Sequence, residues 1–317
     1  MKLLAVDGNS ILNRAYYGIK LLSTKDGIFT NGIYGFLSIL LRMQQETAPD
    51  LIAVTFDMRA PTFRHKRYEG YKANRKGRPD ELAQQMPYLK ELLGYLGYAI
   101  VELEGYEADD LLGTLARRCL ESGDECVIAT GDRDSFQLVG GGVSVRLAST
   151  KGGRPQAEMI DEAAIAEKYG GITPAELIEV KALMGDSSDN IPGVAGVGEK
   201  TALALIGQYH SVDAIYSDLD NLDIKDNLRE KLRAGRDMAY MSRELAEINC
   251  AAPIETTPRD CVKQPVDNAA AYNLMARLEI FSLMDKFGVR PEKLRETAAA
   301  REEESSPSLD ILFGLIP

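Results

Sequence analysis

The sequence opens with a short apolar run that ends in an aspartate, Leu3-Leu4-Ala5-Val6-Asp7. Two similar runs follow, Leu51-Ile52-Ala53-Val54-Thr55-Phe56 before Asp57 and Cys126-Val127-Ile128-Ala129-Thr130 before Gly131-Asp132. Continuous apolar runs of this length are typical of strands that are buried on both faces of a parallel sheet. We therefore expect three buried parallel strands, each followed by an acid.

Helical patterns lie between these strands, at 32–45 and 82–95, and a fourth strand is expected at 98–101. This alternation of strands and helices predicts a doubly wound, mostly parallel α/β sheet. Ligands of such sheets bind beyond the carboxyl ends of the strands, where the aspartates would lie.

The length of 317 residues exceeds that of a usual single domain, so two domains and a short appendage are expected. We expect an α/β domain over 1–171. Strand signals fade beyond about residue 172, and Thr173-Pro174 is a favourable helix start, so an all-helical domain is expected over 172–290. The polar, low-complexity run from Arg295 predicts a linker or tail over 291–317.

The amino-acid composition limits both the class of protein and the side chains that are available for catalysis or metal binding. Hydrophobic residues make up 45% and charged residues 27%, which is ordinary for a globular protein. The sequence contains no apolar run that approaches the roughly 20 residues needed to cross a bilayer, and Asp7 comes too early for a signal peptide, so a soluble, cytoplasmic protein without a membrane partner is expected. Four cysteines and two histidines are too few for a disulfide scaffold, a zinc site or histidine-based catalysis. Carboxylates are therefore expected to carry any chemistry.

Several acids stand at expected strand ends or in short clusters. The nine candidates are Asp7, Asp57, Glu107, Asp109, Asp110, Asp132, Asp134, Asp186 and Asp189. Above one sheet edge they would repel and raise each other's pKa unless cations neutralise them. Oxygen ligands suit Mg²⁺ or Mn²⁺, and two such ions about 3.5 to 4 Å apart promote phosphodiester hydrolysis. Solvent-facing or helix-capping acids are the alternative for any single member.

Two other acid-based or phosphate-based chemistries fit less well. A phosphatase with an aspartyl nucleophile would need Asp-x-Asp after the first strand, whereas this chain has Asp7-Gly8-Asn9. The run Gly198-Glu199-Lys200-Thr201 ends like a Walker A motif, but it lacks the motif's beginning and follows an expected helix instead of a strand.

The net charge of -11 alone argues against a polyanionic partner, but the charges are unevenly distributed. Residues 59–78, the basic arm, contain one acid, Glu69, and eight bases: Arg59, Arg64, Lys66, Arg67, Lys72, Arg75, Lys76 and Arg78. Such an arm is a candidate phosphate contact, and a solvated loop is the alternative.

The stretch 191–206 indicates a helix, a glycine hairpin and a second helix. Gly196 and Gly198 permit a tight turn whose backbone N–H groups face outward at the start of the second helix. This arrangement would hold a DNA backbone without reading bases. A plain connection between two helices is the alternative.

Five motifs in order resemble the 5′ nuclease domain of bacterial DNA polymerase I, a family that belongs with the flap endonucleases. They are Thr55-Phe56-Asp57, the segment 63–75, Gly105-Tyr106-Glu107-Ala108-Asp109-Asp110, Thr130-Gly131-Asp132-Arg133-Asp134 and Gly185-Asp186-Ser187-Ser188-Asp189-Asn190-Ile191-Pro192-Gly193. The resemblance runs from Met1 to about Val289. It implies a metal-dependent, structure-specific nuclease that removes 5′ flaps and RNA primers in DNA replication and repair, as a 5′-to-3′ exonuclease and flap endonuclease.

The resemblance also implies roles for individual residues. Asp7, Asp57, Glu107 and Asp109 would hold one metal, with Asp110 close by, and Asp132, Asp134, Asp186 and Asp189 would form the second carboxylate group. The basic arm would form a helical arch around the 5′ strand, in which Lys72 and Arg75 stabilise the scissile phosphate. Tyr71 would stack on a base or pack within the arch, and Arg14 and Arg64 would contact DNA. The hairpin would grip the duplex through Gly193, Gly196, Gly198, Lys200 and Thr201, with K⁺ on its carbonyls.

A complete DNA polymerase I would continue into polymerase domains, so the chain is expected to be a monomeric fragment of such a protein or a free-standing nuclease. Two rival functions remain open. One is a non-catalytic DNA-binding module with vestigial acids, but none of the nine acids is missing. The other is a single-strand ribonuclease of the related α/β group, which would lack the arch and hairpin that are indicated here.

Overall fold

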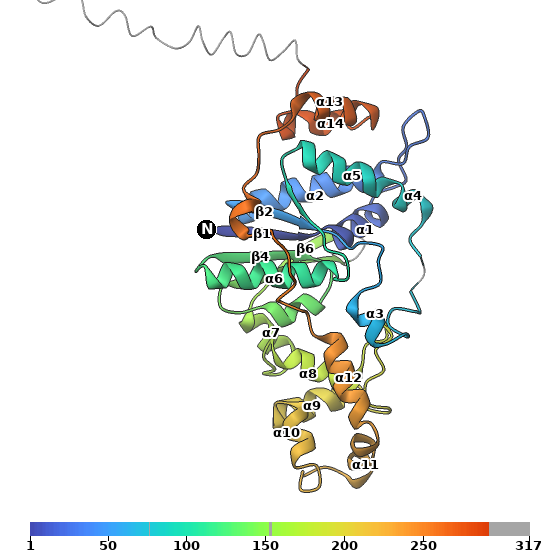
Figure 1. Ribbon diagram of the computed structural model, residues 1–317, viewed down its shortest axis with the longest axis vertical. Helices are drawn as coiled ribbons and strands as arrows, with labels where there is room; N and C mark the ends of the chain where they lie inside the picture. The colour runs from blue at the N-terminus through green and yellow to red at the C-terminus, as the bar shows by residue number, and fades with distance from the viewer. Residues whose placement is uncertain (76, 152–153, 292–317) are drawn as a thin grey trace, which may run out of the picture.

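A single mixed sheet lies at the centre of the molecule in the computed structural model, which describes residues 1–75, 77–151 and 154–291 (Figure 1). The strand order is β3-β2-β1-β4-β5-β6. The first five strands are parallel, and β6 pairs antiparallel with β5. The strands are β1 (Lys2–Asp7), β2 (Leu51–Thr55), β3 (Ala99–Val101), β4 (Glu125–Thr130), β5 (Val143–Lys151) and β6 (Arg154–Ile160).

The central strand β1 shows why these runs form strands buried on both faces. Leu4 and Val6 belong to one hydrophobic core, whereas Leu3 and Ala5 belong to another on the opposite face. Successive side chains of a strand point to opposite faces, so an unbroken apolar run supplies both cores at once.

Helices cover both faces of the sheet (Figure 1). On one face lie α1 (Gly8–Gly18), α2 (Asn31–Thr47) and α5 (Gln85–Tyr95). On the other lie α6 (Ala108–Glu121), the short turn η1 (Asp134–Leu138) and α7 (Glu162–Lys168). The α/β layering that the sequence predicts is confirmed.

A group of helices forms its own core at one end of the long axis (Figure 1). It comprises α8 (Glu176–Met184), α9 (Glu199–Tyr209), α10 (Val212–Ser217), α11 (Asp226–Ala234) and α12 (Arg236–Ala246). Its core includes Val180, Leu183, Leu205 and Ile206. The glycine hairpin lies in the connection between α8 and α9, and the second predicted helix is α9; the first helix expected within 191–206 was wrong, because α8 ends at Met184 and residues 191–198 are not helical.

The last described stretch returns to the sheet. It forms η2 (Pro258–Cys261), α13 (Asn268–Arg277), α14 (Phe281–Met284) and η3 (Asp285–Phe287). Ala252 and Cys261 join the core on the α6 side, and Leu274 and Met275 join the core of α2 and α5 from the side that faces away from the sheet (Figure 1). Residues 252–289 therefore pack with the α/β part, although the sequence pattern grouped them with the helical domain.

The predicted elements agree with the structure to within a few residues. The four expected strands correspond to β1, β2, β3 and β4, and the helix expected at 32–45 is α2. The helix expected at 82–95 is divided into α4 (Asp80–Ala83) and α5, which meet at Gln84. The strands β5 and β6 were not predicted. The tail predicted over 291–317 lies outside the described residues, apart from Pro291.

Within the described residues the basic arm is helical only at α3 (Phe63–Arg67), and α4 begins just beyond it. Turns occupy 69–74, so the described part of the arm is not one continuous helical arch. In the part of the chain that the structure describes, no helix is long and apolar enough to span a membrane.

Candidate functional site

The predicted acids lie at the topological switch point of the sheet, where the strands that follow β1 are added first on one side of it and then on the other. The crossover after β1 leads to β2 on one side, whereas β4 lies on the other side of β1. This geometry opens a crevice beyond the carboxyl ends of β1 and β4, which is where doubly wound sheets bind ligands. Asp7 ends β1, and Asp132 follows β4 directly.

Asp7 is buried at the base of this crevice. One carboxylate oxygen accepts from the backbone N–H of Ser10 at 2.9 Å and so caps α1, and the other accepts from the Thr130 hydroxyl at 2.8 Å. Burial raises the pKa of Asp7 to about 6, with smaller contributions from Asp57 and Asp132. Ionising a carboxyl group that is buried close to other acids costs free energy. A nearby cation would reduce this cost.

Three more acids surround the N-terminus of α6. Glu107 is its N-cap, and Asp57 accepts from the backbone N–H of Ala108 at 2.8 Å. Asp109 lies in the first turn, where burial raises its pKa well above the ordinary range and the charges of Asp7 and Asp132 raise it further. The helix N-terminus favours this accumulation of negative charge.

The second acidic cluster contains an internal cation, Lys181 of α8. Its ammonium contacts Asp134 and lies 2.7 Å from a carboxylate oxygen of Asp186. Burial acts to raise the pKa of Asp186, but hydrogen bonds from Lys181 and Ser188 lower it to about 2. Burial raises the pKa of Asp134 to about 6, and Asp132 contributes in the same direction.

Sequence reasoning missed Lys181. The available signal was a lysine placed between Val180 and Ala182, five residues before Asp186. Such a lysine in an apolar stretch of helix indicates a buried partner of opposite charge.

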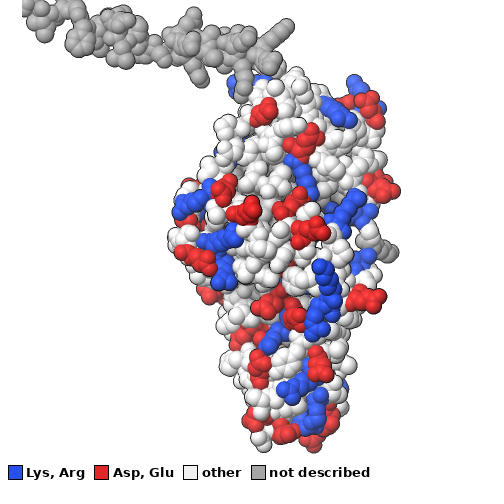
Figure 2. All heavy atoms as spheres, viewed as in Figure 1, with Lys and Arg blue, Asp and Glu red and all other residues white. Residues whose placement is uncertain are grey.

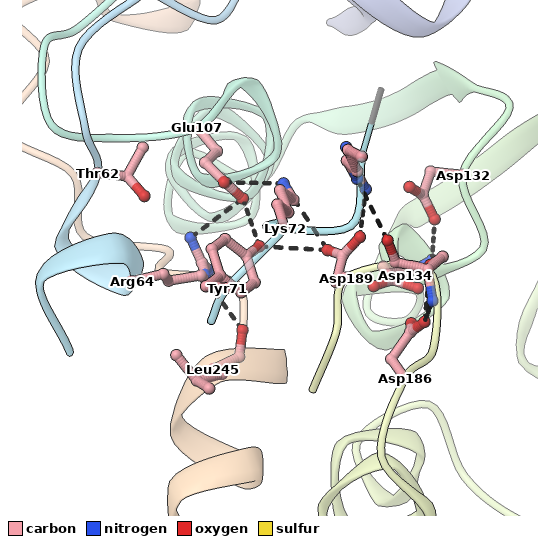
Figure 3. Close-up of polar contacts among 12 residues, drawn as sticks. Thr62, Arg64, Tyr71, Lys72, Glu107, Asp132, Asp134, Asp186, Asp189 and Leu245 are labelled. Atoms are coloured by element: carbon pink, nitrogen blue, oxygen red, sulfur yellow. Dashed lines mark hydrogen bonds and ion pairs between the residues drawn. The ribbon is translucent and has the colours of Figure 1, made fainter. Parts of the chain in front are cut away.

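Two bases of the arm reach Glu107 and Asp189, as Figure 3 shows for Lys72. The Lys72 ammonium lies 2.8 Å from Glu107 Oε1 and 3.7 Å from Asp189 Oδ2, and Arg75 also pairs with Asp189. Burial acts to lower the pKa of Lys72, but Glu107 and Asp189 raise it. The two bases predicted to meet the scissile phosphate therefore face the acidic crevice.

The acids line two adjoining cavities. The larger, of about 510 Å³, is lined by acids of the first group together with Asp132 and Asp189. The smaller, of about 440 Å³, is lined by Asp132, Asp134, Lys181 and Asp186. Asp189 thus lies with Glu107, although the resemblance groups it with Asp134 and Asp186.

The structure speaks against metal binding by Asp110. Its side chain is 0% exposed, and its two oxygens accept from the Arg64 guanidinium at 2.8 Å each. They also accept from the backbone N–H groups of Glu107 and Asn249. Asp110 is therefore saturated by protein donors, and we remove it from the expected ligands.

Arg64 and Tyr71 were also predicted to contact DNA, but both side chains are buried in the structure. Arg64 is 2% exposed, and besides pairing with Asp110 it donates to the carbonyls of Leu245 and Glu247. Tyr71 is 3% exposed, and its hydroxyl donates toward Glu107 at 3.0 Å and Asp189 at 3.2 Å (Figure 3). Tyr71 is therefore packed instead of free to stack on a base, and it contacts His65 of the arm as well as Ile191, Leu245 and Ala246 outside the arm.

Arg14 projects from α1 toward the start of the loop after β4. A Cβ atom at Gly131 would lie 2.8 Å from Arg14 Nη2, so a glycine is required for this close approach. The arginine side chain is partly buried beside Gly131, a position consistent with its predicted contact to phosphate. That contact stays a prediction.

The hairpin presents only some of its predicted contacts to solvent. Gly196, Gly198 and Lys200 are exposed, whereas Gly193 is buried and donates its backbone N–H to Ser242 Oγ at 3.0 Å. A Cβ at Gly193 would lie 2.3 Å from the backbone nitrogen of Gly185, so this glycine serves close packing. We therefore remove Gly193 from the expected DNA contacts. Thr201 lies half-buried in the first turn of α9.

The surface charge is mixed. Figure 2 shows acidic and basic side chains interspersed over the visible face, with several basic side chains near α3. Of the bases downstream of the hairpin, Arg229 and Arg233 pair with nearby acids, whereas Lys231 Nζ lies 3.4 Å from the Gly196 carbonyl. Lys231 therefore adds a positive charge to the hairpin itself.

The donor set fits a hard divalent cation, although several of the acids are held in ion pairs, namely Glu107, Asp134, Asp186 and Asp189. In the described part of the chain, no three acidic, histidine or cysteine side chains form a ready-made metal site. Asp109 Oδ1 and Asn9 Oδ1 are nevertheless buried without a hydrogen-bond partner in the structure. Buried oxygens of this kind require a donor or a cation, and carboxylate and amide oxygens are ligands that Mg²⁺ accepts.

Comparisons with known proteins agree over nearly the whole described chain. Residues 2–170 match the family model of the 5′-3′ exonuclease N-terminal resolvase-like domain, and residues 172–269 match that of the 5′-3′ exonuclease C-terminal SAM fold. DNA polymerase I of Caldicellulosiruptor bescii is 42% identical over 289 residues, which is 91% of this chain and 34% of that protein. DNA polymerase I of Bacillus subtilis is 39% identical and covers 98% of this chain and 34% of its own length. The chain thus spans about a third of the length of these relatives.

Solved structures share the fold. The D15 protein of bacteriophage T5, co-crystallised with metal ions, superposes with a TM-score of 0.64 at 22% identity over 87% of this chain and 99% of that chain. The catalytic core of Rad2 in complex with DNA substrate superposes with a TM-score of 0.58 at 18% identity over 87% of each chain. Together with the two family models, which follow one another along the sequence, these findings show that the chain belongs to the 5′-3′ exonuclease family.

Proposed function

We propose that this protein is a structure-specific DNA 5′ nuclease that acts both as a 5′-to-3′ exonuclease and as a 5′-flap endonuclease in primer removal and DNA repair. One observation carries the proposal: acids from five separate segments converge on a single crevice whose opposite side presents Lys72 and Arg75. A non-catalytic binding module would have no need for this convergence of acids.

We propose that Asp7, Asp57, Glu107 and Asp109 hold one Mg²⁺ or Mn²⁺ and that Asp132, Asp134 and Asp186 hold a second, with Asp189 between the two groups. When bound, the two ions would activate the attacking water and stabilise the leaving oxygen. The metal would also replace the arm's bases as the counterion of the acids.

The chain's own bases then have a role at the phosphate. Lys72 and Arg75 are fixed cations beside the acids, so they would offset the negative charge that develops on the phosphate during hydrolysis. The products would be a 5′-phosphate and a 3′-hydroxyl. Lys181 would remain beside Asp134 and Asp186 and limit the repulsion between these acids.

The exposed part of the hairpin would hold the duplex by its phosphate backbone. Gly196, Gly198, Lys200 and Thr201 lie at the N-terminus of α9, where backbone N–H groups favour anions. The K⁺ ion predicted on the hairpin carbonyls, the monomeric state, and a polymerase module beyond the chain stay predictions.

Cleavage of a 5′-end-labelled flap duplex tests the proposal, with Mg²⁺ in one arm and excess chelator in the other. We expect metal-dependent cutting near the flap junction, with a single-stranded RNA control left largely intact. Tight flap binding without cutting in Mg²⁺ or Mn²⁺ would favour the non-catalytic module. Preferential degradation of the RNA would favour the ribonuclease.

A further inference from the structure

Two asparagines join the basic arm to the loop 186–191, which carries Asp186 and Asp189. Asn190 Nδ2 donates to the carbonyl of Gly70 at 2.7 Å. Asn74 Nδ2 donates in the opposite direction, to the carbonyl of Ser187, also at 2.7 Å. We call this reciprocal pair of contacts the asparagine clasp. Each side-chain amide satisfies a backbone carbonyl of the other segment, so the two segments are tied at two points.

Between these two points, the backbone N–H of Lys72 donates to the carbonyl of Asp189 at 2.8 Å. Lys72 and Asn190 both adopt a left-handed conformation with φ of 56°. Residues other than glycine rarely adopt this conformation, although asparagine tolerates it better than most. Such strain persists only where surrounding contacts enforce it, and it occurs preferentially at functional sites.

This backbone conformation decides where the Lys72 ammonium points. Lys72 reaches across the crevice to Glu107, and Arg75, three residues later, pairs with Asp189 (Figure 3 for Lys72). A lysine side chain has many rotamers, so a fixed backbone is required for its ammonium to occupy one place. The clasp supplies contacts on both sides of Lys72, at residues 70 and 74.

Apolar packing offers a competing explanation for the ordered arm. Tyr71 forms a small cluster with Ile191, Leu245 and Ala246. This cluster anchors the segment to α12, but hydrophobic contact is not directional and does not define the conformation of the neighbouring residue. Hydrogen bonds to both flanking turns do define it. The two explanations predict different effects of removing the Asn190 amide.

We infer that Asn190 is a positioning residue for DNA cleavage and acts by holding the backbone of Lys72. This inference rests on the proposed nuclease function. The clasp aims Lys72 into the acidic crevice before substrate arrives, so less ordering remains when the phosphate binds. The expected consequence of losing the clasp is a slower chemical step with little change in DNA affinity.

The test uses Asn190→Gly and Asn190→Asp. Both residues accept the left-handed backbone, but glycine removes the amide and aspartate places a carboxylate opposite the Gly70 carbonyl. Single-turnover cleavage of flap DNA with enzyme in excess measures the chemical step, and a binding titration in chelator measures affinity. We expect both variants to cut about tenfold more slowly or worse, since small displacements of catalytic groups have effects of this size. Affinity should stay within about threefold of the wild type.

A double-mutant cycle separates positioning from general stability. If Asn190 acts through Lys72, then Asn190→Gly will slow the Lys72→Ala enzyme no further. Rate losses that multiply in the double variant would overturn the inference, as would an unchanged rate in Asn190→Gly. Hydrogen exchange adds a readout without catalysis, because the Lys72 amide should exchange faster in Asn190→Gly and remain protected if packing alone holds the arm.

Two further outcomes are also decisive. If Asn190→Gly loses its cooperative thermal transition, Asn74→Ala takes its place in the double-mutant cycle with Lys72→Ala, because Asn74 is exposed. The same rate criteria then apply. If the wild-type protein does not cut flap DNA, the proposed function fails and the inference fails with it. Cutting by the wild type with unaffected clasp variants would overturn the inference alone.

Discussion

Replacing Asp7 by asparagine is expected to make the metal-free protein more stable while abolishing cleavage of DNA. Asp7 is buried, and burial raises its pKa from 3.8 to about 6. A folded-state pKa above the unfolded value means that folding favours the protonated acid. Above pH 6 the ionised carboxylate therefore destabilises the fold, and this cost disappears as the pH falls through 6 toward 4. Asparagine carries no charge and keeps the cap on Ser10.

The size of the effect follows from the pKa. At 1.36 kcal/mol per pKa unit, the difference between 3.8 and about 6 corresponds to about 3 kcal/mol at pH 8. At pH 5 roughly half of this cost remains. For a chain of 317 residues, about 3 kcal/mol corresponds to a rise in Tm of about 5 °C.

Differential scanning calorimetry at pH 8 and pH 5, in chelator and in saturating Mg²⁺, measures this difference. We expect Asp7→Asn to exceed the wild type in Tm in chelator at pH 8, by less at pH 5, and to gain less from Mg²⁺. A variant no more stable than the wild type at pH 8 would refute the reasoning. Asp124→Asn is a matched control, because this buried acid pairs with Arg259 at 2.9 Å, away from the site, and its loss should destabilise the protein regardless of metal.

Four further substitutions test individual contacts. Lys181→Met removes the buried counterion of Asp134, so Tm should fall in chelator and fall less in saturating Mg²⁺; equal losses would contradict a role for Lys181 as that counterion. Asp134→Ala should abolish cleavage while flap-DNA affinity in a gel-shift titration stays nearly unchanged, and unchanged turnover would remove Asp134 from the mechanism. Arg64→Met leaves Asp110 buried and unpaired, so calorimetry should show a loss of about 3 to 5 kcal/mol with or without metal; a selective loss of DNA affinity would instead restore Arg64 as a DNA contact. Lys231→Ala should reduce the slope of log affinity against log salt concentration by about 1, and an unchanged slope would exclude a phosphate contact there.

The central strands of the sheet could be predicted because the apolar pattern of each lies within one short stretch of sequence. The runs that end at Asp7, Asp57 and Thr130 are apolar without interruption, and this pattern arises only where both faces of a strand are buried. The strands β5 and β6 were harder to identify, since Arg146 and Glu158 interrupt their apolar residues. Their pairing with each other and with β4 depends on contacts that are distant in sequence.

The positions of the acids in sequence predicted one shared site, since parallel strands place their carboxyl ends at one edge. Sequence could not assign each acid its role. Asp109 and Asp110 are neighbours in the first turn of α6, and Asp110 is fully buried while Asp109 is partly buried. The turn of the helix directs Asp109 toward the crevice and Asp110 toward Arg64, so one keeps an oxygen without a partner and the other is saturated.

The sequence by itself determined the fold class, the family and the set of candidate acids, because hydrophobic periodicity and motif order are properties of the chain alone. Only the tertiary structure decided that Lys181 lies between Asp134 and Asp186, that Arg64 and Tyr71 are buried, and that residues 252–289 pack with the α/β part. The physical reason is that burial and charge pairing depend on which segments meet in space. Several of those meetings join residues that are distant in sequence: Lys181 and Asp134 are 47 positions apart, Tyr71 and Asp189 are 118 apart, and Arg64 and Leu245 are 181 apart.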